Sequence, residues 1–486
     1  MKNISIKVLK TVFVTVCMGG LCAACTSSHD INITGLVRHT DGALLVYQRS
    51  VDGMFNSQTF DTLKLQKDST FTLKLLGGEY ERLKFYLYGK KEMGSLIAKK
   101  GNIQVELDGW TEKPMTVTKG QNDKTTHVAE LLDQLYEDVF AIRTRSGDRW
   151  QITRDTEAAS VRRKLTDYAL SLDKEVEGVD KDLRDKARQD IRIQLLLAFQ
   201  DKVLSTDLKS SEAKKQEWLA QLDSMAAFCS INNPCSPFSL SFYDAASYDV
   251  SIRYHAKKEP KPEGVKEGVQ LAFYDFTHRL TGKEQEAALA QLFLEDESQQ
   301  RYDPQLLKLA DEFSRLYPES KWMPWVNRAV GKNRAFNETI IPADIHFSDV
   351  SSAKTIKDVT DRYKGKVIFM DIWATWCGPC RESFAHIAPL QEYATANDVV
   401  LLYLSIDRPE YEEKWRKMAA YYNLKGEHVR AQEAFVREIY DTFGNNGAFS
   451  IPRYVIFDKQ GKIRFKKAAS PEQWDKLKGQ LLEAAK

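Results

Sequence analysis

The most informative segment of this 486-residue chain is DIWATWCGPC, which runs from Asp371 to Cys380. It follows the apolar run 367–370 and carries two cysteines three residues apart. When the first cysteine of such a pair stands at a helix N-terminus, both sulfurs lie at one end of the helix, close enough to form a small disulfide ring. The pattern therefore predicts a buried strand that leads into a redox-active dithiol.

Each residue of the motif has a physical role in that chemistry. A thiolate at Cys377 would face unpaired backbone N–H groups and the positive end of the helix dipole, so the pKa of this thiol should fall below the ~8.5 of a free cysteine. Cys377 is the expected nucleophile, and Cys380, one turn further in, is the expected resolving thiol. Pro379 suits the first helical turn, and Gly378 leaves the space around the nucleophile open. Asp371 is the single acid of the strand; burial should raise its pKa, and it could take the Cys380 proton, directly or through a water.

A zinc half-site or a simple structural disulfide is the alternative for such a pair of cysteines. Zinc would need a second pair of Cys or His residues at ligand spacing. His386 lies along the following helix and His428 is remote from any cysteine pair, so neither completes a site. The sequence favours redox chemistry and predicts no metal.

The segment Asp371–Cys380 resembles the active-site signature of thioredoxin-fold proteins. Within that superfamily, residues 340–486 resemble the TlpA/ResA type of membrane-anchored thiol:disulfide oxidoreductase, as found in lipoproteins of the Bacteroidota. The resemblance implies that Trp376 belongs to the active-site loop. It also implies that Pro452 is the family's cis-proline, which with Ile451 presents backbone to an incoming peptide. An ordinary proline at a strand entry is the alternative.

The other elements of that fold follow in the required order. We expect a helix over 381–395, strands at 399–406, 453–457 and 462–465, and a closing helix over 471–485. The segment 408–446 is longer than in a minimal thioredoxin and is predicted to form two helices. Alignment with thioredoxin places Tyr403 where that family carries a lysine beside the buried acid, which makes the relay around Asp371 uncertain.

The N-terminus predicts export and lipidation. Three lysines in the first ten residues precede an apolar run, so residues 1–24 are expected to be a signal peptide that is too short to span a membrane stably. Two alanines directly before Cys25 resemble a bacterial lipobox, although Cys22 replaces the usual leucine. Cys25 would become the lipidated first residue and 25–30 a short tether; an ordinary cleaved signal with an incidental cysteine is the alternative.

Composition agrees with an exported, folded protein. Removing residues 1–24 takes away three lysines and no acids, which leaves 67 basic against 68 acidic residues. No basic patch argues for nucleic acid as a partner. The length allows about three domains of ~150 residues.

We therefore predict a multidomain α+β chain. Residues 31–120 alternate with period two and contain Asp-Gly turn signals, which predicts a small antiparallel β-sandwich. Residues 125–332 show helical periodicity and should be all-helical. Residues 340–486 should form the thioredoxin-like α/β domain. The first two domains carry no catalytic motif, so the β-domain has either a spacing role or a binding role.

Two further cysteines, Cys229 and Cys235, flank a turn in the helical segment. In an oxidising compartment they could form a structural disulfide, remain two unpaired thiols, or act as a second redox relay. The sequence leaves these three alternatives open.

The residues and the resemblance together predict a thiol:disulfide oxidoreductase that faces the periplasm, needs no cofactor and acts as a reductase. Gly378-Pro379 resembles the reducing members of the superfamily. The resemblance implies a membrane electron donor of the DsbD/CcdA type, with misoxidised exported proteins or apocytochrome c thiols as substrates. The alternatives are a disulfide donor or isomerase and, from other classes, a non-catalytic binding lipoprotein or a copper-handling protein that would use His428.

Overall fold

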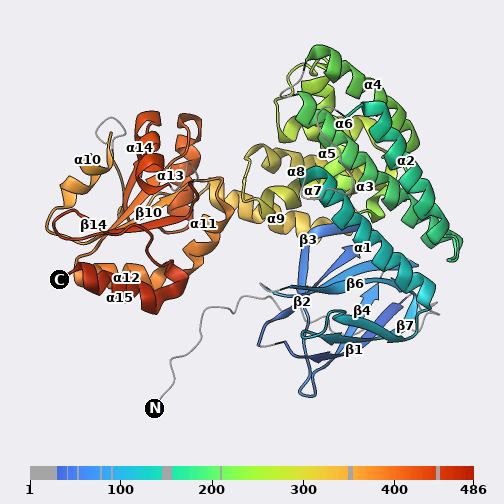
Figure 1. Ribbon diagram of the computed structural model, residues 1–486, viewed down its shortest axis with the longest axis horizontal. Coiled ribbons are helices and arrows are strands. Elements are labelled where there is room, and N and C mark those ends of the chain that lie inside the picture. The colour runs from blue at the N-terminus through green and yellow to red at the C-terminus, as the bar shows by residue number, and fades with distance from the viewer. Residues whose placement is uncertain are drawn as a thin grey trace. The chain divides into compact units, whose positions relative to one another are not determined.

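The computed structural model describes residues 30–40, 42–51, 54–76, 79–88, 91–144, 156–207, 211–348, 354–444 and 449–486 (Figure 1). The chain separates into two compact units. One holds the described residues before residue 53 together with Phe60–Asp133, and the other holds Met54–Thr59 and Gln134–Lys486. The predicted signal peptide 1–24 and the lipidated Cys25 lie outside the described residues.

The N-terminal strands form two four-stranded sheets, ordered β4-β1-β7-β8 and β3-β2-β5-β6. Period-two alternation is clear in β7, where Ile103, Val105 and Leu107 are buried and the residues between them are exposed. One expectation was wrong: the sandwich is not purely antiparallel, because β1 pairs with β7 in parallel. The strands are β1 (Asp30–Arg38), β2 (Leu45–Val51), β3 (Met54–Thr62), β4 (Thr70–Leu76), β5 (Tyr80–Leu87), β6 (Lys91–Lys99), β7 (Gly101–Asp108) and β8 (Met115–Lys119).

A helical segment follows, as the periodicity predicts. Its longest helix, α3, is buried along most of its second half, which explains the apolar run 195–199. The helices are α1 (Asp123–Thr144), α2 (Ala158–Glu175), α3 (Lys181–Asp207), α4 (Glu212–Phe228), α5 (Phe242–Ser251), α6 (Val269–Arg279), α7 (Gly282–Ser298), α8 (Gln305–Leu316) and α9 (Met323–Asn337).

The C-terminal part is a six-stranded sheet between two layers of helices, which confirms the expected thioredoxin-like fold. The strand order is β14-β13-β10-β11-β12-β9, and β13 alone runs antiparallel to its neighbours β10 and β14. Helices α12 and α15 cover one face, and α10, α13 and α14 cover the other (Figure 1). The strands are β9 (Ile345–Phe347), β10 (Ile368–Trp373), β11 (Val400–Ser405), β12 (Gly426–Arg430), β13 (Arg453–Phe457) and β14 (Ile463–Phe465). The helices are α10 (Ile356–Thr360), α11 (Gly378–Ser383), α12 (Ala388–Asn397), α13 (Glu412–Tyr421), α14 (Glu433–Phe443) and α15 (Trp474–Ala484).

Two details of this domain differ from expectation. The helix expected over 381–395 is broken into α11 and α12, because Pro389 at the start of α12 lacks an N–H and fits only a first turn. The segment 408–446 contains a strand, β12, between its two helices. This five-residue strand is too short to stand out from its polar neighbours in sequence.

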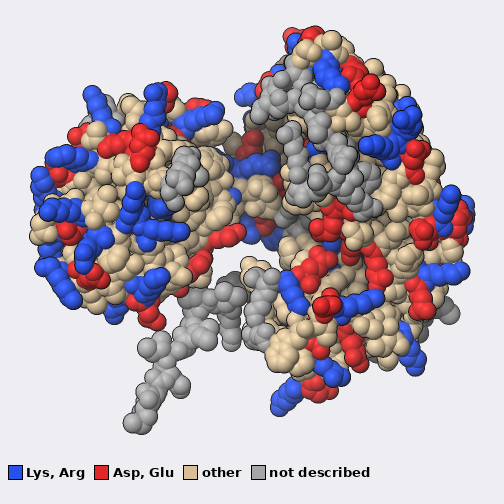
Figure 2. Space-filling model, viewed as in Figure 1, with Lys and Arg blue, Asp and Glu red and all other residues tan. Residues whose placement is uncertain are grey.

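The surface shows no single dominant charge. Figure 2 shows Lys and Arg interspersed with Asp and Glu over the visible face, in keeping with the nearly balanced composition. Among the residues that the structure describes, none of the helices combines the length and apolar character needed to cross a membrane.

Candidate active site

The two cysteines of the CGPC sequence lie where the buried strand β10 gives way to α11. Cys377 is the N-cap of this helix, and its Sγ accepts a hydrogen bond from the backbone N–H of Cys380 at 3.2 Å. The two residues form a disulfide with their Cα atoms 5.3 Å apart. Cys377 keeps 4 % of its surface exposed and Cys380 none. The sulfur at the helix end is therefore the one nearer to solvent, as the roles of nucleophile and resolving thiol require.

The loop around the nucleophile is open. Trp376, directly before Cys377, is 60 % exposed, and Pro379 is exposed as well. A Cβ placed on Gly378 would meet only the Arg381 Nη2 atom, at 3.9 Å. A partner could approach Cys377 without displacing protein atoms on this side.

Asp371 is buried in the middle of β10. Its side chain is 1 % exposed, and Oδ1 has no hydrogen-bond partner. Burial raises the pKa of this carboxyl to about 8, because the charged form loses its hydration without gaining a compensating bond. Asp371 can therefore carry a proton at neutral pH, which is the property expected of a group that exchanges protons with a nearby thiol.

Two tyrosines flank Asp371 in register, one on each neighbouring strand. Tyr403 of β11 and Tyr454 of β13 are both paired with Asp371, so the three side chains lie on the same face of the sheet. The Tyr454 hydroxyl donates to Ser383 Oγ at 2.8 Å, whereas the buried Tyr403 hydroxyl lies near Gln391 and makes no hydrogen bond of normal geometry within the described residues. Burial, and secondarily Asp371 itself, raise the pKa of both phenols. Both tyrosines therefore stay neutral and supply no positive charge to lower the pKa of Asp371.

His428 of β12 is paired with Tyr403 of β11 and so continues the line of side chains across the sheet from Asp371. Its ring stacks on Tyr403 with a centroid separation of 4.7 Å, and Nε2 lies 2.7 Å from the carbonyl oxygen of Leu424. The side chain is fully buried, and burial lowers its pKa to about 4. The structure places His428 two strands away from the cysteine-bearing strand, not beside the dithiol, and the described residues contain no cluster of three or more Cys, His, Asp or Glu side chains suited to a metal.

The peptide bond between Ile451 and Pro452 is cis, as the resemblance implies. It precedes β13, whose first residue Arg453 is paired with Ile372 of β10. The half-buried Ile451 and Pro452 therefore lie at the end of the sheet where β10 leads into the dithiol loop.

The comparisons with known proteins point in one direction. Residues 337–481 match a protein-family model described as Redoxin. The C-terminal part of this chain is a Redoxin domain. The thiol-disulfide oxidoreductase ResA of Geobacillus thermodenitrificans is 26 % identical over 102 residues, which cover 21 % of this chain and 54 % of that protein. Thioredoxin from Coprinus comatus is 42 % identical over 43 residues, or 9 % of this chain and 41 % of that protein.

One solved structure also matches part of this chain. The thioredoxin domain of a thiol-disulfide oxidoreductase from Bacteroides vulgatus is 21 % identical, with a TM-score of 0.22, and covers 25 % of this chain and 81 % of that one. The chain spans about half the length of the ResA proteins it matches, at 54 %. The expected likeness to the ResA type is confirmed by these relatives, and the family model places the Redoxin domain at residues 337–481.

Sequence analysis missed a network that fixes the loop before Cys377. Thr375 donates to Asp407 through both its backbone N–H, at 2.9 Å, and its hydroxyl, at 2.8 Å, and Ser405 donates to the same carboxylate at 2.8 Å. Arg381 Nη1 donates to the carbonyl oxygen of Thr375 at 2.5 Å. The one signal in the sequence is an acid directly after the apolar run 399–406, at the strand end where the Redoxin domain carries its chemistry.

Cys229 and Cys235 are free thiols, so the structural disulfide considered from sequence is not formed. Cys229 ends α4 and is buried, which raises the pKa of its thiol to about 12, and burial also raises the pKa of the half-buried Cys235. Of the three alternatives, the structure matches two unpaired thiols.

Proposed function

We propose that this chain is an extracytoplasmic, lipid-anchored thiol:disulfide oxidoreductase that reduces disulfides of exported proteins. The observation that carries the proposal is the asymmetry of the dithiol: Cys377 caps a helix and keeps 4 % of its surface exposed, whereas Cys380 is fully buried. Such an arrangement suits one sulfur that attacks a partner and one that resolves the product.

The reaction balances with the dithiol alone. The Cys377 thiolate attacks one sulfur of the substrate disulfide, a new S–S bond forms between them, and the first substrate thiolate leaves and takes a proton from water. The Cys380 thiol then loses its proton, for which the ionised form of Asp371 is the assigned acceptor. The Cys380 thiolate attacks Cys377 Sγ, and the second substrate thiolate leaves. Two electrons have passed to the substrate, and the enzyme ends as the Cys377–Cys380 disulfide.

Turnover requires a source of electrons outside the cytoplasm. We assign this role to a membrane thiol transporter of the DsbD/CcdA type, which would reduce the disulfide by the same exchange in reverse. Apocytochromes c whose thiols have been oxidised to a disulfide, and misoxidised exported proteins, are the substrate classes that fit. No cofactor is needed for any of these steps.

The location rests on the N-terminal sequence, in which Cys25 follows a predicted signal peptide. A diacylglyceryl group and an N-acyl chain on this cysteine would provide the two or more chains that stable anchoring takes. Metabolic labelling with a fatty acid should mark the wild-type protein and leave Cys25→Ala unlabelled. Labelling of both would remove the anchor from the proposal.

The activity is tested by reduction of insulin with dithiothreitol as electron donor. The wild-type chain should accelerate precipitation of the insulin B chain, and Cys377→Ser should not. Equal rates for the two proteins would contradict the proposed function.

A further inference from the structure

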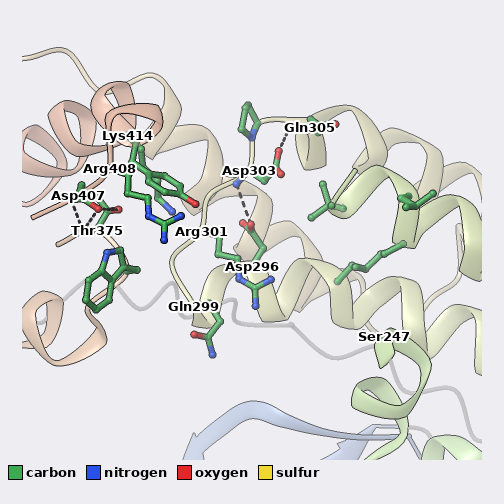
Figure 3. Close-up of a pocket in the computed structure, with 18 of the residues that line it drawn as sticks. Ser247, Asp296, Gln299, Arg301, Asp303, Gln305, Thr375, Asp407, Arg408 and Lys414 are labelled. Atoms are coloured by element: carbon green, nitrogen blue, oxygen red, sulfur yellow. Dashed lines mark hydrogen bonds between the residues drawn. The ribbon is translucent and has the colours of Figure 1, made fainter. Parts of the chain in front are cut away.

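A large cavity adjoins the dithiol loop within the second compact unit. Its volume is about 1200 Å³, and Thr375 and Trp376 line it directly before the nucleophile. The other lining residues come from α11, from the segment after β11, from the start of α13, from α14 and from the helical segment that precedes the Redoxin domain (Figure 3). The mechanism above uses none of this volume.

The two walls of the cavity are in direct contact. Arg381 Nη2 donates to the carbonyl oxygen of Gln299 at 3.1 Å. The ring of Tyr302 lies against Phe336, 4.8 Å away, and against Tyr421, 5.6 Å away. The helical segment thus supplies one wall of a site whose other wall holds the active-site loop.

The carboxylates of the cavity are already occupied by hydrogen-bond donors. The donors to Asp407 are described above, and Figure 3 shows the bonds from Thr375. Asp296 accepts from the Asp303 N–H and from Asn333 Nδ2, both at 3.1 Å, and Asp303 in turn accepts from the Gln305 N–H at 2.9 Å. The remaining acid, Glu433, is bound to Arg437 at 2.6 Å.

Most of the positively charged side chains that line the cavity, unlike its carboxylates, have no partner of opposite charge among the described residues. Arg301 pairs with Glu295 at 3.1 Å, but Arg381, Arg408 and Lys414 form no ion pair with any carboxylate in the described parts of the chain. Arg381 is 7 % exposed, and its hydrogen bonds within the described residues go to two backbone carbonyls. Burial and the nearby Arg381 lower the pKa of Lys414, and the charges of Asp296 and Asp407, which lie beyond ion-pair distance, oppose this shift. The formal positive and negative charges of the lining residues balance. The cavity therefore attracts a ligand through hydrogen-bond donors that have no carboxylate partner in the described chain, and not through a net positive charge.

We propose that this cavity binds a carboxylate-bearing segment of the disulfide substrate, with Arg408 and Lys414 as its ligands. Both side chains point into the space beside the Thr375–Asp407 pair in Figure 3. The volume exceeds the ~300–1000 Å³ usual for small-molecule sites and fits a short stretch of extended peptide. This inference rests on the proposed function, and it makes acidic residues near the substrate cysteine a determinant of recognition.

Binding of a cysteine-free peptide tests the site without using the dithiol. The probes are a short dye-labelled peptide that contains glutamates and its twin with glutamine at the same positions, and fluorescence anisotropy with the mature chain gives their affinities. The glutamate peptide should bind about tenfold more tightly than the glutamine peptide. Lys414→Gln and Arg408→Gln should each weaken the glutamate peptide by about 10- to 100-fold, the range expected for one charge-assisted hydrogen bond.

Lys417→Gln is the matched control, because Lys417 lies on the same helix, pairs with Glu413 at 3.0 Å and does not line the cavity. It should leave both affinities within about twofold, and Lys414→Arg, which keeps the charge, should retain most of the preference. If Lys414→Gln fails to fold, the exposed Arg408 carries the test alone.

The outcomes are separable. Equal binding of the two peptides by the wild-type chain, or equal losses in Lys414→Gln and Lys417→Gln, would overturn the proposal. Glutathione disulfide competing as well as the glutamate peptide would assign the donors to a small disulfide with the same carboxylates and overturn the peptide assignment. Failure of the wild-type chain to reduce insulin would instead refute the proposed function. The peptide affinities would still show whether the cavity binds a carboxylate-bearing peptide.

Discussion

Replacing Asp371 by Asn should change how the stability of the Redoxin domain depends on pH. Burial raises the pKa of Asp371 to about 8 in the folded chain, whereas an aspartate in an unfolded chain titrates near ~3.9. Between these two values the folded state holds a proton that the unfolded state has released. The carboxyl therefore destabilises the fold as pH rises, by about 1.4 kcal/mol per pH unit, and the loss is complete near pH 8.

Asn cannot ionise, so this dependence should disappear in Asp371→Asn. From pH 5 to pH 7 the stability of the variant relative to wild type should rise by roughly 2–3 kcal/mol, and entry of water into the wild-type site would reduce that figure. The buried amide brings a cost of its own, on the order of 1–3 kcal/mol, but this cost does not vary with pH. The slope is therefore the diagnostic quantity.

Hydrogen exchange followed by mass spectrometry can measure this in the whole chain. Peptides that cover β10 report the free energy of opening of the Redoxin domain, even though the protein has several domains. The disulfide is kept oxidised in both proteins, and the control is Asp441→Asn, an exposed acid on α14. The free energy of opening of Asp371→Asn could instead differ from that of wild type by the same amount at pH 5 and at pH 7. That result would show that Asp371 is already ionised in the folded state and would refute the reasoning.

Two further predictions concern the same site. Cys380→Ser should accumulate a mixed disulfide between Cys377 and a substrate, detectable by mass spectrometry under non-reducing conditions, because the resolving thiol is missing; rapid release of the substrate would contradict the assigned roles. Tyr454→Phe should cost about 1 kcal/mol of unfolding free energy, since its hydroxyl donates to Ser383, whereas Tyr403→Phe should change it by less than about 0.5 kcal/mol. Denaturant titration of the two variants checks this, and equal losses would contradict it.

The parts of the site that are local in sequence could be predicted from sequence. The apolar run before Asp371 dictates a buried strand, and the spacing of Cys377 and Cys380 dictates a dithiol at a helix start. The cis bond at Pro452 followed from the resemblance, and Tyr403 does lie directly opposite Asp371 as the alignment placed it.

The parts that depend on long-range contacts could not be predicted. Asp407 joins Thr375 across 32 residues of sequence, and Arg381 meets Gln299 across 82, so no periodicity connects them. The free state of Cys229 and Cys235 depends on the local geometry of the turn, which spacing alone leaves open.

The reduction potential of the Cys377–Cys380 pair tests the central claim most directly. It is measured on the mature chain by equilibration against glutathione or dithiothreitol buffers of known ratio. A reductase fed by a membrane electron donor predicts a value near the ~−270 mV of thioredoxin. A value near the ~−120 mV of a strong oxidant would contradict the account and make this protein a donor of disulfides.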